Sequence, residues 1–192
     1  MTLNALPNKA DLRAQVKASR VQQVKDETLV AGLRAGFARQ LARLVQDTDA
    51  KTVAAYLPFG TEPDIGEFLS FAKDRGIQLV LPVSQADGTL RWVRWNRETE
   101  PGLFGFEEPL GESCELSEAD LILMPALAVD SQGNRLGKGK GFYDRALEGI
   151  SPNIRRLAVV YDDEILDHIP AEAHDQKVNG AVTQTRSIWF EG

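Results

Sequence analysis

Cysteine is nearly absent from this chain of 192 residues, which holds only Cys114. A single cysteine excludes an internal disulfide and a zinc site made of several thiolates. Long apolar runs are missing as well. The longest, from Leu121 to Val129, has nine residues and contains a proline, whereas a membrane-spanning helix needs about 20. The first residues lack a basic start followed by an apolar stretch, so we expect no secretory signal, no membrane partner and a cytoplasmic location.

Positive charge is in the minority, because 22 Lys and Arg residues stand against 28 Asp and Glu and give a net charge of −6. This acidic balance argues against general nucleic-acid binding. Hydrophobic residues make up 43% of the chain and charged residues 26%, proportions that exclude disordered and low-complexity proteins. The length predicts one domain over residues 1–192, large enough to bury a full core without disulfides or a structural metal.

Helix and strand patterns alternate along the chain. Apolar residues recur at helical spacing over residues 9–45, with a break near residues 26–28 and Asn8 as the expected N-cap of the first of two helices. Short apolar runs typical of strands buried on both faces lie at 52–57, 77–81 (ended by Pro82), 121–124, 157–161 and 180–184. We also expect helices at 65–75 and from Phe142 onward, a strand at 90–95 and a loop at 96–118. This alternation predicts an α/β, single-domain, three-layer fold with a mostly parallel central sheet and helices on both faces.

A glycine-rich segment, residues 133–145, stands out at a position where such sheets bind ligands, beyond the carboxyl end of a strand. Four glycines fall within nine residues, and four cations against Asp144 give the segment a charge of +3, which leaves −6 − 3 = −9 for the rest. Glycine allows close approach to backbone N–H groups, which form anion-binding nests, and a helix begins just after the loop. The loop fits neither a Walker A nor a GxGxxG pattern. We therefore expect a polyphosphate site, and a flexible surface turn is the alternative.

Two carboxylates bear on this site. Asp144 beside the loop cations suits a metal-bound triphosphate, and an ion pair with Arg135 or Arg145 is the alternative. Glu62 follows the first predicted strand at the ligand edge, where a surface role is equally compatible with the sequence. Lys9 and Arg13 lie on one helix face, but Lys17 and Arg20 extend that stripe and favour a solvated surface.

The segment from Met124 to Arg145, with its core R-L-G-K-G-K-G-F-Y-D-R, resembles the signature of the 5-formyltetrahydrofolate cyclo-ligase family, also called methenyltetrahydrofolate synthetases. The resemblance extends along nearly the whole chain through Lys9–Arg13, Leu57–Asp64, Leu81–Pro82, Glu108–Pro109 and Ile169–Asp175. The chain departs from the family pattern at Val129, where Phe is frequent, and at Asn179, where an acidic residue is common. Neither departure falls on a position with an expected chemical role.

This resemblance implies an ATP- and Mg²⁺-dependent closure of 5-formyltetrahydrofolate to 5,10-methenyltetrahydrofolate, with release of ADP and phosphate. In the family's scheme the formyl oxygen is phosphorylated before the ring closes. The implied partner is a small-molecule folate, with or without a polyglutamate tail, together with ATP as co-substrate. The sequence leaves the oligomeric state open, and a monomer is the simplest expectation.

The resemblance also assigns roles to residues. It places ATP at Lys9, Arg13, Arg135, Gly137, Lys138, Gly139, Lys140, Gly141, Phe142, Tyr143 and Asp144. It places the folate at Leu57, Phe59, Glu62, Gly139, Lys140, Gly141 and Tyr143, and the metal at Asp144 and Asp175. The expected catalytic residues are Arg135, Lys138, Lys140 and Tyr143.

Two other functions are compatible with parts of this pattern. A folate- or nucleotide-binding module of the same fold would keep the cleft and lack turnover, but the full charged set favours an enzyme. An RNA-binding protein could use the basic loop, but the −9 on the remaining chain counts against it. His168 and His174 are six positions apart and could form a metal pair, but roles without a metal are favoured. Trp92 and Trp95 are expected to face opposite sides of a strand.

Overall fold

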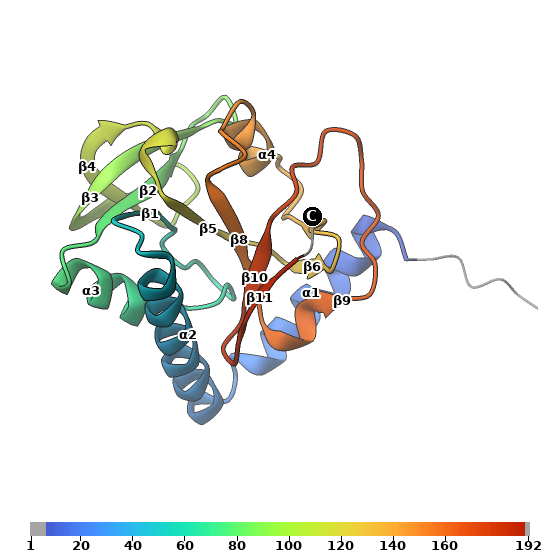
Figure 1. Ribbon diagram of the computed structural model, residues 1–192. Coiled ribbons are helices and arrows are strands. Elements are labelled where there is room, and N and C mark those ends of the chain that lie inside the picture. Colours follow the sequence, from blue (N-terminus) through green and yellow to red (C-terminus); the bar gives the residue numbers. More distant parts are fainter. Residues whose placement is uncertain (1–6, 191–192) are drawn as a thin grey trace, which may run out of the picture.

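The computed structural model describes residues 7–190 (Figure 1). Two helices open the chain, α1 (Lys9–Gln23) and α2 (Glu27–Thr48), so the predicted break is confirmed. The side chain of Asn8 accepts hydrogen bonds from the amides of Ala10 and Asp11, as expected of an N-cap, and Asp26 caps α2 through the amide of Leu29. Asn8 therefore caps the start of the predicted helical stretch, and Asp26 lies at the break that divides it.

The central sheet has eight strands in the order β11-β10-β8-β5-β1-β2-β3-β4. Its parallel part consists of β1 (Thr52–Ala54), β2 (Gln78–Ser84), β5 (Leu121–Pro125), β8 (Arg155–Val159) and β10 (Gly180–Val182). Antiparallel strands complete the edges: β3 (Leu90–Pro101) and β4 (Glu107–Cys114) at one, β11 (Ser187–Trp189) at the other. The predicted mostly parallel sheet is confirmed.

Helices cover both faces of this sheet. On one face α2 and α3 (Gly66–Asp74) bury Phe37, Leu41 and Phe68 against the strands, and Figure 1 shows these two helices together on one side. On the other face lie α4 (Phe142–Leu147) and the 3₁₀ turn η1 (Leu116–Glu118). Trp92 packs on this second face and Trp95 on the first, as the alternation along a strand requires.

A second, three-stranded sheet was not predicted from the sequence. It consists of β6 (Ala128–Asp130), β7 (Arg135–Leu136) and β9 (Ile165–Leu166), with the 3₁₀ turn η2 (Asp162–Glu164) leading into β9. Leu12 and Val16 of α1 pack against Leu136 and its neighbours. This packing fixes α1 beside the glycine-rich loop, which begins where β7 ends.

Two predictions about strands were wrong. Residues 96–118 are not a loop, because β3 runs to Pro101 and returns as β4; these edge strands carry exposed charged side chains and so lack an apolar run. Pro82 does not end β2 but pairs with Trp92 of β3 inside it. β1 pairs with β2 only as far as Val80, so the missing N–H of Pro82 leaves no bond to β1 unmade.

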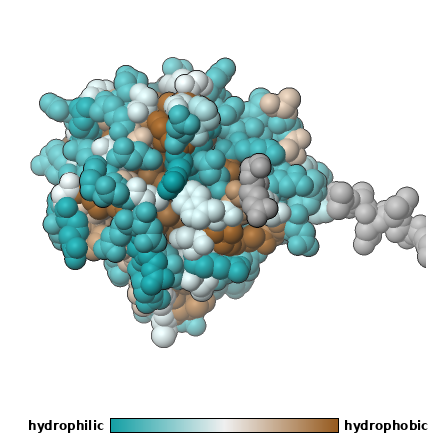
Figure 2. All heavy atoms as spheres, in the orientation of Figure 1, coloured by the Kyte–Doolittle hydropathy of each residue, from teal (hydrophilic) through white to brown (hydrophobic). Residues whose placement is uncertain are grey.

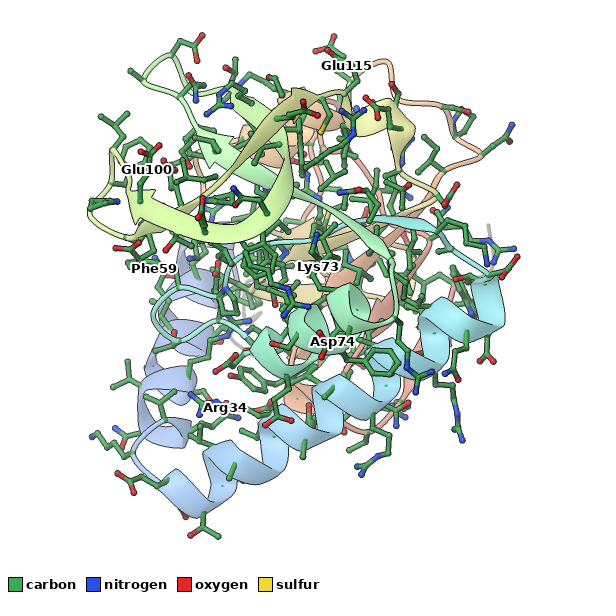
Figure 3. All side chains as sticks on the ribbon, turned by 90° about the vertical axis from the view of Figure 1, so that its left-hand side faces the viewer. Arg34, Phe59, Lys73, Asp74, Glu100 and Glu115 are labelled. Carbon is green, nitrogen blue, oxygen red and sulfur yellow. The ribbon has the colours of Figure 1, made fainter. Side chains whose placement is uncertain are left out.

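The outer part of the β3–β4 hairpin bends back toward the middle of the sheet. Its register shifts between Trp95 and Thr99, and the carboxylate of Glu108 accepts a hydrogen bond from the amide of Ser84, the last residue of β2. In Figure 3 the hairpin strand that carries Glu100 lies beside Phe59, which follows β1. The hairpin thereby forms one wall above the carboxyl ends of β1 and β2.

The face seen in Figure 2 is mainly hydrophilic, with small hydrophobic areas between polar side chains. Among residues 7–190, no helix combines the length and apolar character needed to cross a membrane.

Candidate functional site

A cleft of about 1020 Å³ lies beyond the carboxyl ends of β1, β2 and β5. Its walls come from α1, the loop after β1, the tip of the β3–β4 hairpin, the glycine-rich loop with α4, and residues 172–176. The structure brings all the residues with predicted site roles into this cleft: Lys9, Arg13, Leu57, Phe59, Glu62, Arg135, Gly137, Lys138, Gly139, Lys140, Gly141, Phe142, Tyr143, Asp144 and Asp175. They come from positions far apart in the sequence.

The glycine-rich loop is held by its carbonyl groups. Arg13 donates a hydrogen bond from Nε to the carbonyl of Gly137 (2.9 Å), and Arg145 donates to the carbonyls of Lys140 (2.8 Å) and Gly88. Gly141 has φ +67°, and a Cβ there would come within 2.9 Å of the Arg145 guanidinium. Within residues 7–190 the backbone N–H groups of residues 137–141 donate no hydrogen bonds. A run of free amides of this kind suits an anion.

Cations surround this loop in two different states. Three are already paired: Lys9 with Asp175 (2.6 Å) and Glu172 (2.8 Å), Arg135 with Asp144 (2.5 Å), and Lys138 with Glu62 (2.7 Å). Lys140 instead lies 3.9 Å above the centre of the Phe104 ring, and Arg13 bonds only the Gly137 carbonyl in the described part of the chain. Arg13 and Lys140 therefore offer positive charge that no carboxylate of residues 7–190 neutralises.

The Lys9–Asp175 contact shifts the titration of both groups. Burial alone would lower the pKa of Lys9, but its hydrogen bonds to Asp175 and Glu172 raise that pKa above its ordinary value. Burial would raise the pKa of Asp175, but the hydrogen bonds from Lys9 and from the Glu172 amide hold it below its ordinary value. Both groups are thus charged across the neutral pH range.

Asp144 and Asp175 could hold a divalent cation. Asp144 accepts hydrogen bonds at Oδ1, from Arg135 and the amide of Gln176 (3.0 Å). Asp175 accepts hydrogen bonds at Oδ2. In the described residues the second oxygen of each carboxylate has no hydrogen bond, and no group of three metal-ligating side chains is present. Two carboxylates completed by phosphate oxygens fit Mg²⁺. The alternative ion pair between Asp144 and Arg135 is present in this structure.

The far side of the cleft is aromatic. Phe59 lies 4.5 Å from Phe106 between ring centres, Phe104 lies 6.3 Å from Phe106, and Phe104 contacts Phe142 edge to face at 6.1 Å. The sequence does not point to Phe104 and Phe106, because it predicts a loop over residues 96–118. The alternating F-G-F before Glu107 was the available signal.

Tyr143 lies between the aromatic side and the loop. Its ring meets Trp92 edge to face at 6.3 Å, and its buried hydroxyl has no hydrogen-bond partner among residues 7–190. Burial, followed by the charge of Glu62, raises the pKa of Tyr143 well above its ordinary value. A neutral hydroxyl that lacks a partner is suited to bind a ligand oxygen or nitrogen.

The predicted solvated stripe on α1 was wrong at Arg20. Its guanidinium is buried and bonds both carboxylate oxygens of Glu164 (2.6 and 2.7 Å) and the carbonyl of Ala126 (2.6 Å). Lys17, by contrast, lines the cleft with Lys9 and Arg13. The helix thus presents a basic row to the cleft and anchors itself with Arg20. Neither histidine takes part in a metal-ligating group within the described residues.

Comparison with known proteins shows to which family this chain belongs. The model of the 5-formyltetrahydrofolate cyclo-ligase family matches residues 5–184. The chain belongs to this family. A Mycolicibacterium smegmatis protein named 5-formyltetrahydrofolate cyclo-ligase is 41% identical over 147 residues, 72% of this chain and 76% of that protein. The protein of the same name from Escherichia coli K12 is 28% identical over 148 residues, 73% of this chain and 81% of that protein.

Solved structures of related proteins have the same fold. The NMR structure of Aquifex aeolicus 5,10-methenyltetrahydrofolate synthetase matches with a TM-score of 0.82 at 27% identity, over 96% of this chain and 93% of that one. A Mycoplasma pneumoniae 5,10-methenyltetrahydrofolate synthetase matches with a TM-score of 0.75 at 22% identity, over 93% of this chain and 99% of that one, and supports the fold alone. The family resemblance is thus confirmed, and the chain is a cyclo-ligase family enzyme.

Proposed function

We propose that this chain closes 5-formyltetrahydrofolate to 5,10-methenyltetrahydrofolate, with or without a polyglutamate tail on the folate, and converts ATP to ADP and phosphate. The observation that carries the proposal is the shared cleft, in which a loop with free amides faces an aromatic wall across one space. Residues from position 9 to position 176 contribute to it, which supports a single working domain over residues 1–192.

The triphosphate of ATP is assigned to the glycine-rich loop. The free amides of residues 137–141 provide donors, and Arg13 and Lys140 provide charge without a competing carboxylate. Arg135 has a buried Nε without a hydrogen-bond partner among the described residues, so it can donate to a phosphate oxygen while it keeps Asp144. Phosphoryl transfer depends mostly on such positioning and charge neutralisation.

Asp144 and Asp175 are the proposed ligands of Mg²⁺, each through the carboxylate oxygen that has no hydrogen bond here. When bound, the metal supplies charge neutralisation on the phosphates. Lys9 keeps Asp175 ionised, and the Gln176 amide orients Asp144. The positions of both carboxylates are thus fixed by groups of this chain.

The folate is assigned to the aromatic side, with its pterin between Leu57 and the phenylalanine cluster. Glu62, to which the resemblance gives a pterin contact, accepts hydrogen bonds from the Phe59 amide and from Lys138. The Glu62–Lys138 pair thus links the folate side to the loop that takes the phosphates. Tyr143 is placed to donate its unpaired hydroxyl hydrogen to a ligand at the same junction.

This arrangement suits a two-step reaction. The formyl oxygen attacks the γ-phosphorus of ATP and the bond to ADP breaks. The second folate nitrogen then attacks the activated carbon and gives up its proton, and the carbon–oxygen bond breaks to release phosphate, which can carry that proton away. An amide oxygen is a weak nucleophile, so alignment of the two ligands in one enclosed site is the main contribution of the protein.

The test is an absorbance assay with purified protein, 5-formyltetrahydrofolate, ATP and Mg²⁺, which follows the methenyl product in the near ultraviolet. We expect a signal that requires both ATP and metal, with ATP-free and EDTA controls flat. Binding of folate and ATP without product would show the alternative, a binding module without turnover.

A further inference from the structure

Glu108 is a buried carboxylate in the cleft that has no cation. The residue is only 5% exposed and lines the cleft from β4. Within residues 7–190 its carboxylate accepts one hydrogen bond, at Oε1 from the Ser84 amide (2.8 Å). Among these residues no hydrogen-bond donor reaches Oε2, and this oxygen is not fully buried. Oε2 is therefore available to a donor on a ligand bound in the cleft.

The other buried or half-buried carboxylates of the cleft each form an ion pair. Glu62, Asp144 and Asp175 each contact a lysine or arginine. Glu107, Glu148 and Glu172 also line the cleft but are exposed to water. Glu108 thus differs from every other cleft carboxylate in the described chain.

Its position beside the aromatic wall restricts what the donor can be. Phe106 comes just before β4, two residues ahead of Glu108, and lines the same cleft. Phe106 packs on Phe59 at 4.5 Å, and a Cβ at Gly102 would come within 2.5 Å of Cδ of Glu108. The carboxylate is therefore held at the edge of the space that a flat ring would fill.

We propose that Glu108 recognises the aminopyrimidine edge of the folate, the edge that carries the 2-amino group and the N3–H. Two neighbouring N–H donors match the two oxygens of a carboxylate. The amino group of adenine is flanked by acceptor nitrogens and makes no such pair, so the assignment is to the folate and not to ATP. Glu62 is then left for other N–H groups of the pterin. This inference rests on the proposed function.

The test compares Glu108→Gln with Glu112→Gln, a variant of an exposed residue of β4 that lies outside the cleft, by calorimetric titration without turnover. Glutamine keeps an acceptor for the Ser84 amide but points an N–H₂ group at the ligand donors. We expect the Kd for 5-formyltetrahydrofolate to rise about 10- to 150-fold in Glu108→Gln. The Kd for ATP stays unchanged, as do both constants in Glu112→Gln. A purely structural role for Glu108 would instead change the two ligands' affinities together.

A modified ligand gives a second readout that needs no variant. A 2-desamino-2-methyl analogue of 5-formyltetrahydrofolate should bind the unmodified protein at least about 10-fold more weakly, and Glu108→Gln should add little to that loss. Full-affinity binding of the natural folate by Glu108→Gln, or of the analogue by the unmodified protein, would overturn the assignment. Folate binding with these losses but no turnover would overturn the proposed function alone, and no folate binding at all would overturn both.

Discussion

Arg20 and Glu164 form a nearly dry ion pair, with side chains only 1% and 4% exposed. Replacing Arg20 by Met removes the guanidinium and leaves the carboxylate buried without its cation. It also leaves the Ala126 carbonyl without the donor at 2.6 Å. Breaking such a pair from one side costs about 3–5 kcal/mol. Since domains of this kind are stable by about 5–15 kcal/mol, we expect Arg20→Met to fold with a Tm about 6–20 °C lower.

The assay is urea unfolding followed by circular dichroism, with two comparison variants. Lys51→Met breaks an ion pair with Asp49 whose side chains are 76% and 85% exposed, so its free energy of unfolding should change by less than about 0.5 kcal/mol. Arg20→Met combined with Glu164→Gln removes both charges, and Gln still accepts from the Tyr161 amide. The double variant should regain at least half of the loss.

The stability of Arg20→Met at acidic pH provides a second test of the Arg20–Glu164 pair. Burial raises the pKa of Glu164, and the hydrogen bond from Arg20 opposes that rise. Without Arg20 the pKa rises further, so protonation on acidification removes the buried charge and the deficit of Arg20→Met shrinks between pH 7 and pH 5. A loss below about 1 kcal/mol, or a double variant no better than the single one, would refute this reasoning.

Three further predictions concern the cleft. Asp144→Asn keeps an acceptor for the Gln176 amide but loses the charge of a metal ligand. Turnover should therefore fall by about 100-fold or more, while the circular dichroism spectrum stays unchanged. Unchanged turnover rates across a Mg²⁺ titration would exclude Asp144 as a ligand. Lys140→Met removes a charge that no described carboxylate neutralises. Initial rates should show a KM for ATP about 10-fold higher. An unchanged KM would show that Lys140 does not contact the phosphates. The contact with Lys9 holds the pKa of Asp175 down. The stability that this contact gives is therefore present above about pH 4 and lost as the pH falls below that value. On acidification the urea midpoint of Lys9→Met should decline less than that of the unmodified protein, and parallel declines would contradict this.

Features that depend only on residues close together in the sequence could be predicted. Asn8 and Asp26 marked the starts of α1 and α2 because side-chain capping is a local interaction. The glycine pattern at residues 133–141 marked the loop, because glycine spacing reflects backbone requirements of the loop itself. These features could be predicted from sequence alone.

Long-range pairing could not be predicted. Arg20 pairs with Glu164, which is 144 positions further along the chain, and nothing near Arg20 in the sequence distinguishes it from Lys17. β3 and β4 contain many polar residues, because the outer part of β3 is exposed and only a short part of β4 there is buried. The aromatic wall and the burial of Glu108 depend on that hairpin, so the sequence does not predict their place in the cleft.

The central claim is that this cleft transfers a phosphoryl group between two ligands bound side by side. Single turnover with 5-formyltetrahydrofolate labelled with ¹⁸O at the formyl oxygen tests this most directly, with mass spectrometry of the released phosphate. The account predicts one labelled oxygen in the phosphate for each methenyl product formed. Methenyl product formed together with unlabelled phosphate would contradict it.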